Sequence, residues 1–190
     1  MDIKTIIQGC KKNDRSSQRA FVDEYSKYLF AVCLRYMKDQ EKAKDCLQDS
    51  LVHILQNIGK YRDSGTFKSW IARVTSNICL QELRRNKNKI TFELEDANEP
   101  CVDESISKTL EVQDILKLIN QLPEKYRIVV NLFIVEDYTH KEIADMLGVK
   151  ESSSRSLVAR ARKQLNSMIQ KEENKQSTTV SIIKKIKRFA

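Results

Sequence analysis

Glycine and proline are scarce in this sequence, which has four glycines and two prolines among its 190 residues. A β-sandwich or β-barrel needs a turn about every ten residues, and turns depend on these two residue types, so both folds are disfavoured. Hydrophobic residues make up 41% of the chain and charged residues 32%, which is typical of a soluble globular protein. We therefore expect an all-α fold.

Long apolar segments are missing as well. No apolar run approaches the roughly 18 residues that are needed to cross a bilayer. The chain starts with Met1, Asp2, Ile3 and Lys4, and this start contains no apolar core of a signal peptide. We expect a cytoplasmic protein with no membrane insertion.

Cysteine does occur, but without the spacing of a metal or disulfide framework. The five cysteines are an odd number and include no C-x-x-C pair. Cys33, Cys46 and Cys79 lie among apolar residues at helical spacing, which predicts small side chains buried in a core. No metal site and no cofactor are predicted.

The net charge of +8 is distributed unevenly along the chain, with +8 on residues 1–90 and −6 on residues 91–120. Residues 93–104 are acidic and lack hydrophobic periodicity, which indicates a linker. The alternative is a long solvated loop, but about 20 structureless residues inside one compact domain would be unusual. We expect two small helical domains joined by a flexible acidic linker: a first domain over 1–90, the linker over 91–108, a second domain over 109–170 and a basic tail over 171–190. The tail is predicted to be either a short basic amphipathic helix or disordered.

The first domain contains a helix with a polar face. An apolar stripe at helical spacing predicts this helix, whose opposite face carries Asp45, Gln48 and Asp49. The stripe consists of Ala43, Leu47, Leu51, Ile54, Leu55 and Ile58. Most polar faces of this kind are simply solvated.

The next predicted helix places Arg73, Asn77 and Arg84 beside an apolar stripe. The stripe consists of Phe67, Trp70, Ile71, Val74 and Ile78. Two arginines and an asparagine suit DNA phosphates and base edges. The preceding polar loop holds Tyr61 between two basic residues, and an aromatic ring in that setting suits unstacked single-stranded bases. From spacing alone, nucleic-acid contact and plain surface charge explain these residues equally well.

The second domain begins with a helix boundary at Leu122-Pro123-Glu124, after which the apolar run from Ile128 to Val135 predicts a buried helix. Thr139 and Glu142 then form an S/T-x-x-E capping box that opens a further helix. Gly148 stands where that helix should end in a left-handed residue.

A last helix is predicted from about Ser152, basic on its outward face. Its inward stripe is Ser154, Val158, Ala161, Leu165 and Met168, and its outward side chains are Arg155, Ser156, Ala159, Arg160, Arg162, Lys163 and Asn166. Two helices joined by a glycine turn, the second rich in small polar residues at its start, predict a helix-turn-helix. The serine-rich start can enter the major groove while the later basic residues neutralise phosphates.

Together these segments resemble two regions of bacterial sigma factors of the sigma-70 family. The segments 42–49, 61–74, Asn77 and 83–85 are similar to the second region of that family, and the segments 122–127, 138–149 and 159–165 are similar to its fourth region. A chain with only these two regions resembles the extracytoplasmic-function (ECF) group. The resemblance covers roughly residues 16–168.

The resemblance implies a non-enzymatic factor that binds core RNA polymerase and promoter DNA, with an anti-sigma factor as a further expected partner. It implies polymerase binding by Asp45, Gln48 and Asp49. It implies capture of the melted minus-10 strand by Lys60, Tyr61, Arg62, Lys68, Arg73, Asn77, Arg84 and Arg85. It implies recognition of the minus-35 element by Thr139, Ser152, Ser153, Arg155, Ser156, Arg160, Arg162 and Lys163.

Two positions of the last helix depart from the family pattern. Ser154 stands where many members carry an aliphatic residue, and Leu157 stands where a polar or basic residue is common. The base-reading pattern of the family is therefore not transferred to this sequence.

Other classes of protein explain less of the sequence. A simple helix-turn-helix repressor accounts for the second domain but leaves the polar helix faces of the first without a purpose. An enzyme is disfavoured because there is no G-x-G-x-x-G, P-loop or H-E-x-x-H motif, and His53 and His140 are isolated. A sensor or anti-sigma module would need a ligand pocket or a metal set, and the sequence indicates neither.

Overall fold

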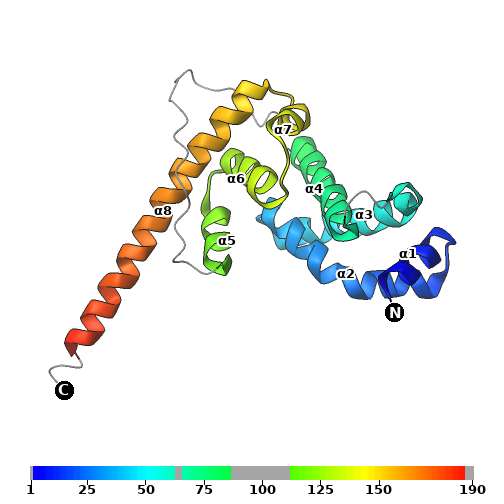
Figure 1. Cartoon of the computed structure of the whole chain (residues 1–190), viewed down its shortest axis with the longest axis horizontal. Coiled ribbons are helices and arrows are strands. Elements are labelled where there is room, and N and C mark those ends of the chain that lie inside the picture. The colour runs from blue at the N-terminus through cyan, green and yellow to red at the C-terminus, as the bar shows by residue number, and fades with distance from the viewer. Residues whose placement is uncertain (1, 63–65, 87–111, 187–190) are drawn as a thin grey trace. The chain divides into compact units, whose positions relative to one another are not determined.

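The computed structural model describes residues 2–62, 66–86 and 112–186. Every regular element within these ranges is a helix, so the all-α prediction is confirmed. The chain divides into two compact units, Met1–Thr91 and Phe92–Ala190 (Figure 1). The linker expected over 91–108 lies outside the described residues, and its extent stays a prediction.

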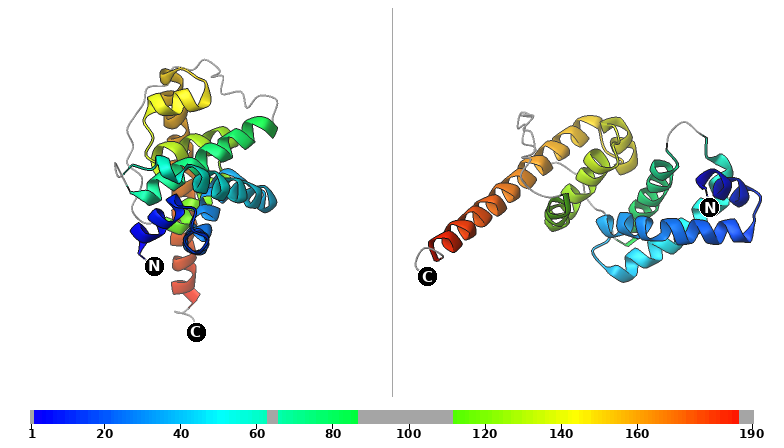
Figure 2. Two further views of the ribbon diagram at one scale, coloured as in Figure 1. Left: turned by 90° about the vertical axis from the view of Figure 1, so that its right-hand side faces the viewer. Right: turned by 60° about the horizontal axis from the view of Figure 1, so that its bottom comes forward.

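The first unit is a bundle of four α-helices. They are α1 (Ile3–Lys11), α2 (Arg15–Tyr36), α3 (Gln40–Asn57) and α4 (Phe67–Asn86), with a 3₁₀ turn over Ile58–Lys60 after α3. Helix α2 packs against the other three, and α3 packs against α4 (Figure 2). Carboxylates cap two of the helices, because Asp14 accepts a hydrogen bond from the Ser17 amide at 2.8 Å and Asp39 accepts one from the Glu41 amide at 2.8 Å.

Aromatic rings fill the core between α2 and the start of α4. The Phe67 ring lies 5.6 Å from Tyr25 and 6.1 Å from Phe21 by ring centroids, in edge-to-face arrangements. The same ring lies 5.1 Å from Tyr61, which follows the 3₁₀ turn. Such contacts add to the stability gained by burying the rings, and they tie the segment before α4 to the bundle.

The buried face of α3 is rotated slightly from the predicted stripe. On α3 the buried side includes Cys46 and Ser50, while Leu47 and Leu51 are only half-buried. The Ser50 hydroxyl donates to the Cys46 carbonyl at 2.6 Å. This backbone acceptor lets a small polar side chain occupy a core position, which hydrophobic periodicity alone does not predict.

Three cysteines from three helices meet in the same core. Cys33 of α2, Cys46 of α3 and Cys79 of α4 are buried and free, so their predicted burial is confirmed. Hydrogen bonds with the other two thiols, together with burial, raise the pKa of Cys79, which keeps it a protonated thiol of low reactivity. Among the described residues, no group of three or more His, Cys, Asp or Glu side chains is arranged to hold a metal ion. Cys101 lies outside the described residues.

The second unit is built around one long helix. Its elements are α5 (Val112–Gln121), α6 (Glu124–Val130), a π-helical turn η2 (Asn131–Val135), α7 (His140–Leu147) and α8 (Glu151–Ile186). Helix α8 packs against α5, α6 and α7. Helix α8 continues into the expected tail as far as Ile186. None of the described helices combines the length and the apolar character required to cross a membrane.

The apolar run from Ile128 to Val135 differs from the single buried helix that its composition predicts. The α-helix ends at Val130 and widens into a π-helical turn, whose end is marked by the Glu136 amide donating to the Asn131 carbonyl at 2.9 Å. Val135 is exposed at the end of this turn. The wider turn changes the angular spacing of the side chains, so the later residues of the run no longer follow the face predicted at 3.6 residues per turn.

Candidate functional site: an acidic helix face and two basic surfaces

The polar face of α3 is present as predicted. Asp45, Gln48 and Asp49 are all exposed, while Ala43 and Ile54 on the other side of the helix are fully buried. Among the hydrogen bonds and ion pairs that the described residues make, none involves the side chains of these three residues. The face therefore presents two carboxylates whose charge no cation of the described residues neutralises by direct contact.

Val52 is a residue of this face that the sequence reasoning missed. Its side chain is 54% exposed, and it lies seven residues after Asp45 and three after Asp49, which places all three on one side of the helix. A lone exposed valine is ordinary on a protein surface, but this one adjoins a cluster of polar side chains. The signal in the sequence was an apolar residue on the side of the helix opposite the buried stripe.

The polar face of α4 holds the basic residues expected to contact DNA. Arg73, Asn77 and Arg84 are exposed along the helix, and Arg85 is exposed near its end. Arg85 also lies 3.9 Å from a carboxylate oxygen of Glu82, a weak surface pair that another anion can replace.

The start of α4 is held by two local contacts. The Thr66 hydroxyl accepts a hydrogen bond from the Ser69 amide at 3.2 Å, which caps the helix. The Lys68 ammonium lies 4.4 Å from the centre of the Tyr28 ring of α2, a cation–π contact that holds this exposed side chain against the bundle.

The loop before α4 places its aromatic residue differently from the sequence expectation. Lys60 and Arg62 are exposed, but Tyr61 is only 9% exposed, with its ring packed against Phe67 and Trp70. The Tyr61 ring is therefore fixed against the bundle, because burial against two aromatic rings outweighs its solvation. Residues 63–65 of the predicted strand-capture loop lie outside the described residues.

The helix-turn-helix predicted in the second unit is confirmed in its local geometry. Thr139 caps α7 by accepting from the Glu142 amide at 3.2 Å, and the Glu142 carboxylate accepts in return from the Thr139 amide at 2.8 Å. Gly148 ends α7 in the left-handed region, with φ of 68° and ψ of 36°. Helix α8 then begins at Glu151, one residue before the predicted start.

The start of α8 exposes two of the side chains expected to read the minus-35 element. Ser152 is exposed, Ser153 and Ser156 are half-buried, and Arg155 is exposed. The Arg155 guanidinium donates to a carboxylate oxygen of Glu151 at 2.6 Å, one turn earlier on the same helix. Further along, Arg160 is half-buried and Lys163 is exposed.

Arg162 is engaged within the second unit. Its guanidinium carbon lies 5.0 Å from the centre of the Phe133 ring, and the His140 ring stacks on the same phenylalanine at 4.5 Å. The stack joins η2, α7 and α8, so Arg162 braces the helix-turn-helix as well as adding positive charge to it.

His140 links the two helices of the motif directly. Its Nδ1 atom lies 3.2 Å from the Ser154 hydroxyl of α8, within hydrogen-bond distance. Burial, followed by the positive charge of Arg155, lowers the pKa of His140 from its ordinary value of 6.5. The neutral imidazole is therefore favoured in this position, and Ser154 meets it where many family members carry an aliphatic residue.

Three residues of α8 that the sequence singled out are Ser154 and Asn166, by their predicted faces, and Leu157, by its departure from the family pattern. Ser154 is fully buried, as its place in the inward stripe predicts, and Leu157 is buried as well, which explains an apolar residue at a position that is often polar. Asn166 was expected to face outward but is only 9% exposed. This expectation was wrong because α8 is covered by α5, α6 and α7 over more than one stripe.

Comparison with known proteins assigns the chain to a family. The sigma-70 region 2 model matches residues 21–89, and the sigma-70 region 4 model matches residues 112–165. The chain is 24% identical over 182 residues to the ECF RNA polymerase sigma factor SigW of Bacillus subtilis, covering 89% of this chain and 97% of SigW. It is 33% identical over 130 residues to the ECF sigma factor SigM of Mycobacterium tuberculosis, covering 67% of this chain and 64% of SigM.

A solved structure agrees in fold. The sigma factor RpoE of Bartonella quintana, determined in complex with the anti-sigma factor NepR, aligns with a TM-score of 0.50 and 19% sequence identity, over 80% of this chain and 96% of RpoE. At this identity the likeness concerns the fold.

The chain is a two-unit protein, helical throughout the regular elements that the structure describes, with an acidic helix face in one unit and a helix-turn-helix in the other. The chain belongs to the sigma-70 family and is an RNA polymerase sigma factor of the ECF group. Sigma factors are initiation factors without catalytic activity, which agrees with the absence of catalytic motifs from the sequence.

Proposed function

We propose that the two units divide the work of promoter recognition. The first unit binds core RNA polymerase and captures the melted minus-10 strand, and the second unit reads the minus-35 duplex. The observation that carries this proposal is the presence, in one chain, of an exposed acidic helix face and a helix-turn-helix with a polar and basic recognition helix.

Core polymerase binds to α3 in this proposal. Asp45 and Asp49 offer unneutralised carboxylates, Gln48 offers both a donor and an acceptor, and Val52 supplies apolar area beside them. A complementary basic surface on polymerase would be steered towards these charges and would gain charge-assisted hydrogen bonds on contact. The family resemblance supports this role, because the matching face in sigma factors docks on the clamp helices of polymerase.

The melted strand binds along α4 in this proposal. Arg73, Arg84 and Arg85 supply positive charge for phosphates, and Asn77 supplies an amide that can pair with a base edge. Lys60 and Arg62 extend the charge to the loop before α4. Tyr61 supports that loop from inside the bundle, because its ring packs on Phe67 and Trp70.

The minus-35 duplex binds the helix-turn-helix. The exposed start of α8 can enter the major groove, where Ser152 and Arg155 reach base edges. Thr139 and Lys163 lie at positions suited to phosphates, and Arg160 and Arg162 add positive potential beside them. The first domain over 1–90 and the second over 109–170 would then be spaced on the promoter by the linker over 91–108.

An anti-sigma factor is proposed as a regulatory partner. The related fold of Bartonella RpoE was solved in complex with the anti-sigma factor NepR, which supports the existence of such a partner here. Because its working partner is RNA polymerase, we place the protein in the cytoplasm.

Run-off transcription tests the proposed function. Purified protein is combined with core RNA polymerase from the same source and with fragments of the cognate genome, and transcripts are mapped. We expect discrete start sites that require the protein. A simple repressor would instead bind DNA without supporting initiation, and the absence of any protein-dependent transcript would contradict the proposal.

A further inference from the structure

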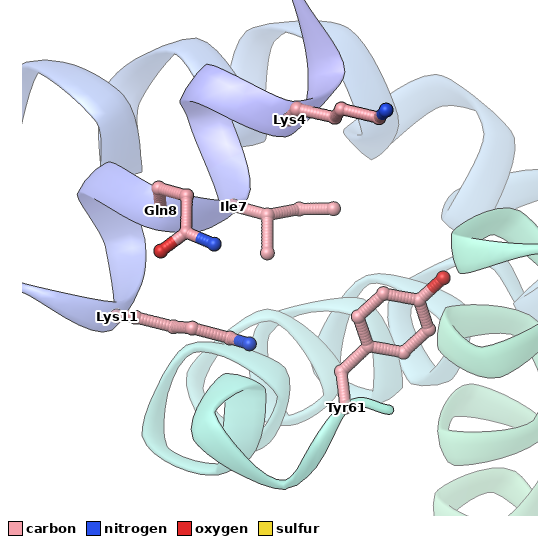
Figure 3. A pocket seen from close by; sticks show the side chains of 5 residues that line it. All are labelled: Lys4, Ile7, Gln8, Lys11 and Tyr61. Atoms are coloured by element: carbon pink, nitrogen blue, oxygen red, sulfur yellow. The ribbon is translucent and has the colours of Figure 1, made fainter. Parts of the chain in front are cut away.

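A cavity lies between α1 and the loop that precedes α4. It has a volume of about 220 Å³ and is lined by Lys4, Ile7, Gln8, Lys11 and Tyr61 (Figure 3). Four of these residues come from α1, and the fifth belongs to the segment to which we assign strand capture. Neither the family-model match, which starts at residue 21, nor the site residues named above include α1.

Helix α1 is fixed firmly enough to form the wall of a site. Ile6, Ile7 and Cys10 are buried in the core of the first unit. Gly9 lets α1 approach α2 closely, because a Cβ atom at this position would lie 2.5 Å from the Cβ of Ser17. The Asp14 amide also donates to the Gly9 carbonyl at 3.0 Å, which closes the turn between the two helices.

The lining of the cavity has the chemistry of a single-strand site. Lys4 and Lys11 are seven residues apart in the sequence. They are therefore separated by about two helical turns, or about 10 Å along the helix axis, and both side chains lie on one side of α1. None of the five lining residues is acidic. Two cations spaced along a helix suit phosphates of one strand, whereas the Tyr61 ring and Ile7 offer apolar surface for a base or sugar and Gln8 offers an amide.

The cavity also continues the surface of α4. The Tyr61 ring that lines it lies 5.5 Å from the ring of Trp70, which is half-buried on α4. Trp70 is followed by Arg73 one turn later and by Asn77 two turns later, on the same side of the helix. The cavity therefore adjoins the end of α4 from which the face with Arg73 and Asn77 begins.

We propose that this cavity binds a nucleotide of the melted promoter strand, with Lys4 and Lys11 contacting its flanking phosphates. Helix α1 is then a third single-strand element beside α4 and its preceding loop. This inference rests on the proposed function, since a strand reaches the cavity only if the first unit captures melted DNA.

The experiment compares two pairs of lysine substitutions in holoenzyme reconstituted with core polymerase. The test variant is Lys4→Gln with Lys11→Gln, and the matched control is Lys27→Gln with Lys38→Gln, which removes the same charge from two other exposed lysines of the unit. The probes are a fork template with a pre-melted minus-10 strand and a duplex limited to the minus-35 region. Both are built on a promoter mapped by run-off transcription, and both are titrated across a salt series.

We expect the test variant to bind the fork template about tenfold more weakly, with the salt slope of binding reduced by about 1.4, or 0.7 for each lost phosphate contact. Binding to the minus-35 duplex and to core polymerase should equal that of the control pair. Equal fork affinity of the two variants would overturn the proposal. An equal loss of affinity for the fork and the duplex would also overturn it, because that result indicates a nonspecific effect of removing positive charge. If the unchanged holoenzyme itself fails to bind the fork template, the proposed function is wrong, and this inference is contradicted as well.

Discussion

Helices α3 and α8 are both amphipathic, and each has a polar face. The two faces differ in whether their charged side chains already make contacts within the protein. On α3, Asp45 and Asp49 make no hydrogen bond or ion pair with other described residues. On α8, Arg155 is bonded to Glu151 at 2.6 Å and Arg162 lies on the ring of Phe133. The α3 face is therefore open to a partner, whereas the α8 face is partly occupied by contacts of its own.

This difference has consequences for binding. Carboxylates without a partner gain the full benefit of a complementary surface, and reversing their charge removes attraction and adds repulsion. Arg155 must exchange Glu151 for a base or phosphate, and this exchange costs little because an exposed pair is worth about 0–1 kcal/mol. Arg162 cannot leave Phe133 without also loosening the packing of the motif. The following predictions test this contrast.

The largest effect is expected from reversing the charge of the α3 face. Asp45→Lys combined with Asp49→Lys should weaken association with core polymerase about 100-fold, or about 2.7 kcal/mol, because attraction becomes repulsion. The melting temperature should stay nearly unchanged, since both residues are exposed. Fluorescence titration with core polymerase measures the first quantity. The control is Asp23→Lys with Glu24→Lys on α2, and unchanged affinity of the test variant would remove α3 from the interface.

On α8, Arg155 and Arg162 should differ in the kind of loss they cause. Arg155→Ala should cost about 1–3 kcal/mol on the preferred minus-35 sequence and relax discrimination there, with little change in stability. Arg162→Ala should weaken binding to all duplexes alike, reduce the salt slope by about 1 and also lower the melting temperature, because the contact with Phe133 is lost. Duplex titrations across salt, together with thermal unfolding, separate the two. If both variants behave identically, the contrast between an exchangeable and a bracing arginine is wrong.

A smaller effect is expected at Val52. Val52→Asn should weaken polymerase association about fivefold, or about 1 kcal/mol, through loss of apolar contact area in the interface. Val135→Asn provides the matched control, because Val135 is 37% exposed in the second unit and lies outside the proposed interface. Equal polymerase affinity of the two variants would show that Val52 is an ordinary exposed side chain.

The smallest effect concerns pH and His140. The folded protein lowers the pKa of His140 below its ordinary value of 6.5, so the unfolded chain takes up the proton first as the pH falls. The contribution of His140 to stability is therefore complete above pH 6.5 and declines as the pH drops through the lowered pKa. Thermal unfolding between about pH 5 and pH 8 should show a loss of stability at the acid end that is smaller in His140→Asn. The same acid loss in both proteins would assign it to other groups.

The comparison of α3 with α8 also explains which parts of the site could be predicted from the sequence. The α3 face follows from periodicity alone, because α3 has one buried side and its exposed side needs no tertiary information. The capping box and Gly148 follow from local chemistry, since each acts within a few residues. Accordingly, the exposed positions of Asp45, Gln48 and Asp49 and the two boundaries of α7 were all predicted correctly.

The features that the sequence did not reveal depend on contacts between distant segments. The packing of the Tyr61 ring on α4 was not predicted, because its aromatic neighbours are brought together only in the folded bundle. The stack of His140, Phe133 and Arg162 involves a residue of the π-helical turn, which hydrophobic periodicity does not predict. Asn166 was misassigned for a similar reason, because several helices cover α8.

Permanganate probing of an open promoter, beside a duplex-binding titration over the same salt series, tests the proposed division of work most directly. Asn77→Ala should bind the upstream duplex as the unchanged protein does but fail to hold the bubble open, because Asn77 lies on the face of α4 to which we assign strand capture. Arg155→Ala should lose discrimination on the minus-35 duplex yet still capture the strand of a pre-melted template. Normal promoter opening by Asn77→Ala, together with loss of strand capture by Arg155→Ala, would contradict the assignment of these tasks to the two units.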